Sequence, residues 1–119
     1  LEPSDQHRWE TVQIFPLDQL MKELEIGRVD LAKIDVEGFE VFAIQGGIEM
    51  IMEWKPILFV ELAEINLRQQ GCTFVQLIDL IDSLGYEILE AKTMQKLDRT
   101  NTDYHTDIIC FSRDSNARQ

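Results

Sequence analysis

The chain has 119 residues, enough for one domain at most, and its formal net charge is −11. This charge argues against nucleic acid and anionic membrane surfaces as partners, because binding to phosphate groups depends on Lys and Arg. A hydrophobic content of 45% lies outside the range of disordered chains, and no apolar run is long enough to cross a membrane. Two cysteines are too few for a disulfide framework, and no charged-then-apolar leader opens the chain. We therefore expect a folded, cytoplasmic domain with free thiols.

The first part of the chain predicts a strand, a short helix and a second strand. Residues 1–8 have no periodicity and are expected to be irregular. Residues 9–15 alternate between apolar and polar side chains, which is typical of a strand. A helix is expected to begin at Pro16 and to end near Gly27, which could serve as its cap. Residues 29–36 are almost continuously apolar, so they predict a central parallel strand that is buried on both faces.

From Gly38 onward the hydrophobic period changes to that of a helix, which continues to residue 52 and is interrupted at Gly46 and Gly47. A second buried strand follows, so the segment from 29 to 62 should form a right-handed βαβ unit. The remaining pattern predicts strands over 57–62, 86–91 and 107–112, a helix over 73–84, polar loops near 66–71 and over 92–106, and a frayed tail over 114–119.

Three acidic residues stand at the ends of the two strands of this unit. Asp35 and Glu37 follow the first strand, and Glu61 lies near the end of the second. Parallel neighbours lie about 4.8 Å apart and end at the same edge of a sheet, so these carboxylates are expected to converge. Such a cluster suits proton abstraction or a Mg²⁺ or Ca²⁺ ion. Alternatively, Glu37 only begins the next helix, where the helix dipole favours negative charge, and Glu61 faces solvent.

The neighbouring glycine and the histidines carry weaker signals. Gly38 would permit either a close backbone approach to a ligand or a tight strand-to-helix turn. The pair Gly46 and Gly47 lacks the spacing of a phosphate-binding loop and indicates a helix break. His7 and His105 lie in polar segments with no nucleophile elbow, so we expect surface histidines and not a hydrolase triad.

Four segments of the chain, in order and spacing, resemble the FkbM-type methyltransferase family: residues 11–20, 29–40, 55–62 and 84–87. The most specific of them contains Lys-Ile-Asp-Val-Glu-Gly at residues 33–38. Members of that family depend on S-adenosylmethionine and mostly methylate hydroxyl oxygens of sugars, polyketides and similar small molecules. The resemblance implies an α/β fold over residues 9–113, with the family's third to last strands in a mostly parallel, Rossmann-like sheet whose terminal strand is antiparallel.

The resemblance also implies roles for individual residues. Asp35 would stand at a strand tip near the reacting methyl group, where Asp35 and Glu37 are the candidate catalytic residues. Asp35 and Gly38 are the residues expected to face the cofactor. By analogy with related O-methyltransferases, Asp35 and Glu61 would hold a metal such as Mg²⁺.

The chain departs from the family pattern at its beginning. The strand and glycine-containing loop that cradle the cofactor, and the acidic residue that grips its ribose, have no counterpart in these 119 residues. The family's first two strands would lie between residues 9–15 and 29–36, so this chain is expected to be inactive alone and to expose an apolar sheet edge that favours self-association. Two other classes therefore stay open, which are a noncatalytic remnant that serves as an interaction module and a divalent-cation-binding domain.

Overall fold

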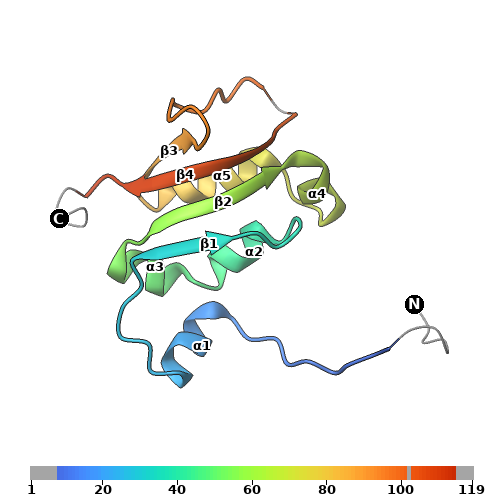
Figure 1. Cartoon of the computed structure of the whole chain (residues 1–119), viewed down its shortest axis with the longest axis vertical. Helices are drawn as coiled ribbons and strands as arrows, with labels where there is room; N and C mark the ends of the chain where they lie inside the picture. Colours follow the sequence, from blue (N-terminus) through green and yellow to red (C-terminus); the bar gives the residue numbers. More distant parts are fainter. Residues whose placement is uncertain (1–7, 102, 115–119) are drawn as a thin grey trace.

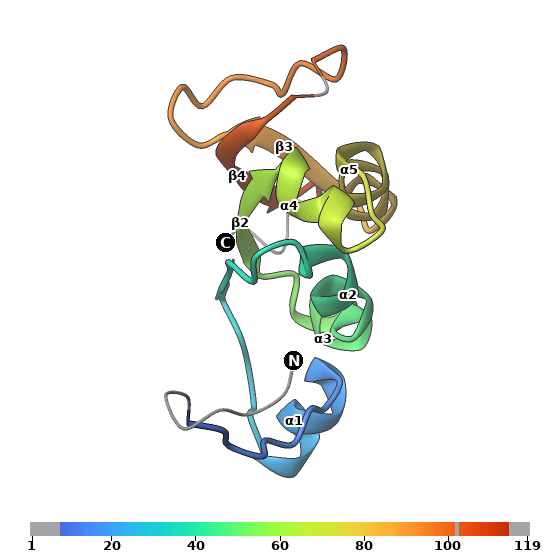
Figure 2. The same cartoon turned by 90° about the vertical axis from the view of Figure 1, so that its right-hand side faces the viewer.

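The computed structural model describes residues 8–101 and 103–114, and the expectations for the start of the chain, including His7, and for its tail fall almost entirely outside this part. The described residues form a four-stranded sheet whose helices α2, α3 and α5 lie on one face (Figures 1 and 2). The strands are β1 (Leu31–Ile34), β2 (Ile57–Ala63), β3 (Tyr86–Glu90) and β4 (His105–Ser112). The helices are α1 (Leu17–Glu23), α2 (Glu40–Gln45), α3 (Ile48–Trp54), α4 (Glu64–Gln69) and α5 (Phe74–Ser83).

The one-sided sheet follows from the alternation of side chains along each strand. In β2, Leu58, Val60 and Leu62 are fully buried, whereas Phe59 and Glu61 between them remain partly exposed. Successive residues of a strand point to opposite faces, so the buried set faces the helices. The other face carries Glu61 and is not covered by a helix of the described residues (Figure 2).

The strand order is β1-β2-β4-β3, and only the pairing of β1 with β2 is parallel. The last strand, β4, is antiparallel to β2 and to β3. It therefore inserts between two strands that point the same way. The expectation of a mostly parallel sheet is not confirmed for this reason, although the terminal strand is antiparallel as expected.

Strand β1 differs most from its prediction. It was expected to be central and buried on both faces over 29–36, but it spans Leu31–Ile34 and lies at the edge of the sheet. Leu31 is 61% exposed, and Ile34 is the only buried residue of the strand. The prediction is wrong because an apolar run shows only that a strand is suited to burial. Burial on both faces also requires neighbouring elements, and the described residues do not supply them. The open apolar edge is present as expected, and self-association through it stays a prediction.

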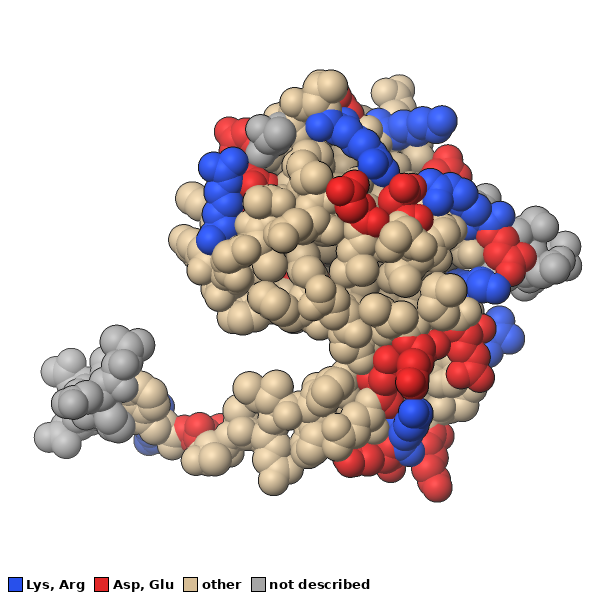
Figure 3. Space-filling view, turned by 180° about the vertical axis from the view of Figure 1, so that it is seen from behind, with Lys and Arg blue, Asp and Glu red and all other residues tan. Residues whose placement is uncertain are grey.

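Residues 9–15 do not form the predicted strand. This segment is extended but unpaired, and Ile14 is 90% exposed. Figure 3 shows it as an arm that stands off from the body of the molecule, with a notch between the two. A strand is stabilised by hydrogen bonds to a neighbouring strand, and no strand of the described residues lies beside the arm.

The expected Gly27 cap is also wrong, since α1 ends at Glu23 with Leu24 as its cap residue.

The loop predicted near residues 66–71 is mostly helical, because α4 continues to Gln69. Leu67 is fully buried and fixes this helix against the core. The polar composition of the segment gave no indication of this contact. Two other expectations are confirmed. Thr73 and Gln76 form a capping box at the start of α5, and the predicted break at Gly46 and Gly47 separates α2 from α3.

Helix α3 begins without a cap from its own N-cap residue, Gly47. The carboxylate of Asp18 in α1 takes this role, because its two oxygens accept hydrogen bonds from the backbone N–H groups of Glu49 and Met50, both at 2.9 Å. The carboxylate thereby satisfies two N–H groups that the helix itself cannot pair. Asp18 therefore joins α1 to α3.

We expect Asp18→Ala to lower the free energy of unfolding by about 0.5–2 kcal/mol, the usual effect of losing a helix cap. Chemical denaturation measures this change. Glu23→Ala removes an exposed carboxylate from the last turn of the same helix and should have little effect. Equal losses in the two variants would show that the contact between Asp18 and α3 contributes nothing.

Candidate functional site

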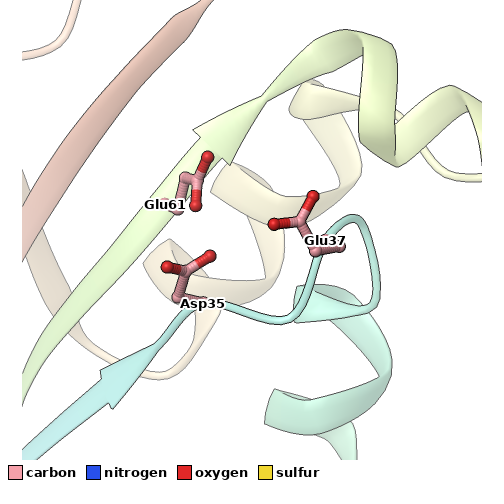
Figure 4. A group of neighbouring side chains, drawn as sticks. All are labelled: Asp35, Glu37 and Glu61. Atoms are coloured by element: carbon pink, nitrogen blue, oxygen red, sulfur yellow. The ribbon is translucent and has the colours of Figure 1, made fainter.

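The three carboxylates at the sheet edge lie together. Asp35, Glu37 and Glu61 each offer an oxygen atom, and these atoms all lie within 4.8 Å of one another. Figure 4 shows the three side chains turned toward a common space from the β1–α2 loop and from β2. The parallel register places Ile34 beside Val60, so the next residues of the two strands, Asp35 and Glu61, are neighbours. The predicted convergence is therefore observed, although the roles of the residues stay predictions.

The loop that carries two of these carboxylates has an unusual backbone. Glu37 has a φ of 52°, in the left-handed region, and Gly38 follows at 100°. A Cβ atom built on Gly38 would lie 2.2 Å from the backbone oxygen of Asn66 in α4. Two roles were predicted for Gly38, a close approach to a ligand and a tight turn. The geometry favours the tight turn, because the protein's own backbone fills the space that a side chain would occupy.

The proximity of the carboxyl groups affects the protonation of the cluster. The pKa of Glu61 is raised, first because its side chain shares a hydrogen bond with Asp35, which requires a proton on one of the two carboxyls. Partial burial and the negative charges of Asp35, Glu37 and Asp107 raise it further. One carboxyl of the cluster therefore tends to keep its proton to a higher pH than an isolated glutamate would.

Two residues near the cluster were not singled out as site residues by the sequence. His105 was expected to be a surface residue and is exposed, but its Nε2 lies 3.5 Å from Oε1 of Glu61. Asp107 lies directly opposite Glu61 in the register of β2 with β4. Finding them required knowing that β4 inserts beside β2, and no local spacing indicates this.

Two of the three carboxylates, Asp35 and Glu61, line an open cavity of about 380 Å³ on the uncovered face of the sheet. Its lining residues come from β1, β2 and β4 and from the residue that follows β1: Lys33, Asp35, Phe59, Glu61, His105, Thr106 and Asp107. The cavity combines three carboxylates, a hydroxyl group, an imidazole, one lysine and the ring of Phe59. Such a lining can receive a hydroxylated or cationic small molecule, or a divalent cation at the carboxylates.

In a comparison with protein families, residues 2–88 align with the model of the methyltransferase FkbM domain. This range contains α1 to α5, β1, β2 and the whole carboxylate cluster. Neither the search of curated proteins nor the search of solved structures found a match. Among the described residues, no helix is both long and apolar enough to span a bilayer. The family resemblance seen in the sequence motifs is thus confirmed.

Proposed function

Since the chain belongs to the FkbM methyltransferase domain family, we propose that it forms the acceptor-binding part of an S-adenosylmethionine-dependent O-methyltransferase. The acceptor is a hydroxyl group of a small metabolite or sugar. The observation that supports this proposal is the convergence of Asp35, Glu37 and Glu61 at the carboxyl end of two parallel strands. Ligands of open α/β sheets bind at this end of the strands.

In this proposal the carboxylates orient the acceptor hydroxyl and remove its proton. Asp35 or Glu37 accepts the hydroxyl hydrogen bond, and a carboxylate in that position is a general base. Glu61 has a raised pKa, so it can hold a proton and act as a donor to a second acceptor oxygen. Loss of the hydroxyl proton makes the oxygen a better nucleophile. Fixed alignment of that oxygen with the methyl group contributes the larger part of the rate enhancement.

The residues present do not complete a site for the cofactor. The family's glycine-containing loop has no counterpart in these 119 residues, and the space at Gly38 is filled by Asn66. The residues of this chain therefore account for the acceptor side of the reaction. The filling of the Gly38 space by Asn66 favours a second class, in which the chain is a noncatalytic interaction module.

A transfer assay on the full-length protein separates these two classes. The protein is incubated with S-adenosylmethionine that carries an isotope-labelled methyl group and with pools of hydroxylated sugars and metabolites. Mass spectrometry that finds the label on an acceptor oxygen supports the methyltransferase. Absence of both transfer and cofactor binding, the latter measured by calorimetry, would favour the noncatalytic module.

The cluster of three carboxylates also supports a divalent-cation site as an alternative function. Mg²⁺ and Ca²⁺ prefer oxygen ligands, and the three side chains could share one ion. Calorimetric titration of the full-length protein with each cation tests this alternative. Binding heat that persists in Glu61→Gln, or no heat at all, would exclude the cluster as the cation site.

A further inference from the structure

A fourth carboxylate, that of Glu40, supports the loop on which the site is mounted. Glu40 is the first residue of α2, and it is only 2% exposed. Its Oε2 accepts a hydrogen bond from the backbone N–H of Val36 at 2.8 Å, and its Oε1 accepts one from the N–H of Gly38 at 3.0 Å. The side chain therefore folds back over the loop that precedes its own helix.

The two bonded N–H groups lie on either side of Glu37. The first belongs to the peptide that joins Asp35 to Val36, and the second to the peptide that joins Glu37 to Gly38. Fixing both peptide planes fixes the directions in which Asp35 and Glu37 leave the backbone. It also holds Glu37 at its positive φ of 52°, a conformation that residues other than glycine rarely adopt without support.

The chemistry of these contacts makes them strong. A buried carboxylate is costly unless it is hydrogen-bonded, and both oxygens of Glu40 have a backbone donor. Hydrogen bonds to a charged acceptor are about twice as strong as those between neutral groups. A buried carboxylate whose two oxygens both accept hydrogen bonds from the 35–39 loop favours one conformation of that loop.

We infer that Glu40 is a positioning residue, which holds the 35–39 loop in the one backbone conformation that brings Asp35 and Glu37 to Glu61. Glu40 faces the loop backbone and not the shared space of the cluster, so it acts through the residues that it orients. Its role in the reaction rests on the proposed function, whereas its role in the loop does not.

The test compares Glu40→Gln and Glu40→Ala in the full-length protein. Glutamine keeps one acceptor oxygen but offers an N–H₂ group where the second oxygen stood, so one backbone N–H loses its partner. NMR couplings and chemical shifts of Glu37 report whether its φ is positive. We expect Glu37 to leave the left-handed region partly in Glu40→Gln and fully in Glu40→Ala. In the transfer assay kcat should fall about 10–100-fold while KM for the acceptor changes less, because misplacement of a reacting group mainly affects the chemical step.

Glu64→Gln is a matched control. Glu64 is also buried, also begins a six-residue helix, and its carboxylate accepts from the backbone N–H of Phe74 at 2.7 Å and from Arg68 at 2.8 Å. This variant should lose stability without changing φ of Glu37. If Glu37 keeps its positive φ in both folded Glu40 variants, or if kcat is unchanged although Glu37 has relaxed, the inference is overturned. Relaxation of Glu37 in a protein whose wild type transfers no methyl group would support the loop role and reject the proposed function.

Discussion

Asp35→Asn in the full-length protein is expected to reduce methyl transfer by about 10²–10⁴-fold, the usual contribution of a general base. Asparagine keeps the size of the side chain but cannot accept the hydroxyl proton. The substitution should not lower the thermal unfolding midpoint, because it removes one negative charge from a crowded cluster. Initial rates of transfer and the unfolding midpoint, measured on the same preparation, test both parts.

Asp30→Asn is the control for this variant, because Asp30 lies at the opposite end of the same strand, exposed and paired with Arg28. It should leave the transfer rate unchanged. Turnover that is retained in Asp35→Asn would remove Asp35 from the mechanism. A loss of turnover accompanied by a large fall in the midpoint would instead indicate a structural role.

The stability of the wild-type protein and that of Asp35→Asn should also depend on pH in different ways. Folding raises the pKa of Glu61, so the folded state holds this proton more tightly than the unfolded chain. The contribution of Glu61 to stability is therefore lost as pH rises from 4.5, its ordinary value, through the raised pKa. Asp35→Asn removes the largest cause of the shift, so its free energy of unfolding should fall less over this range. Denaturation series between acid and neutral pH measure the difference, and parallel curves for the two proteins would contradict the coupling.

The convergence of the carboxylates could be predicted because it depends on local patterns. The local pattern is that of a βαβ unit: one apolar run ends at Asp35, another contains Glu61, and the connection between them has a helical period. Such a unit is right-handed and brings the ends of its two parallel strands to the same edge of the sheet. The capping box at Thr73 and the break at Gly46 have equally local signals. Each of these features is decided by residues that are close in sequence.

The features that sequence did not reveal depend on partners distant in the chain. Residues 9–15 have the alternation of a strand, but a strand forms only beside another. The insertion of β4 next to β2, which brings His105 and Asp107 to Glu61, is decided by the packing of the whole sheet. The contacts of Glu40 depend on two consecutive positive φ angles, at Glu37 and Gly38. No residue pattern in the sequence predicted the positive φ of Glu37.

Gly38→Ala is expected to cause the largest loss of stability among single substitutions near the site. Its φ of 100° strains any residue with a Cβ, at a cost of about 1–3 kcal/mol. The added Cβ would also lie 2.2 Å from the backbone oxygen of Asn66 and 2.7 Å from its carbon, and backbone atoms cannot rotate away. Displacing α4 should cost a further 1–3 kcal/mol or so, typical of overpacking. Chemical denaturation measures the sum, which is a large part of a usual total of about 5–15 kcal/mol.

Gly71→Ala separates the two contributions to this loss. Gly71 also has a positive φ, 76°, but a Cβ there would meet no atom within 4 Å, so only the backbone strain remains. Equal losses at the two positions would mean that the approach of α4 to Gly38 is not tight. The pair also decides between the two readings of Gly38. If Gly38 faced the cofactor, alanine would weaken S-adenosylmethionine binding while leaving the protein as stable as Gly71→Ala; if Gly38 serves the turn, the excess loss of stability appears without any cofactor present.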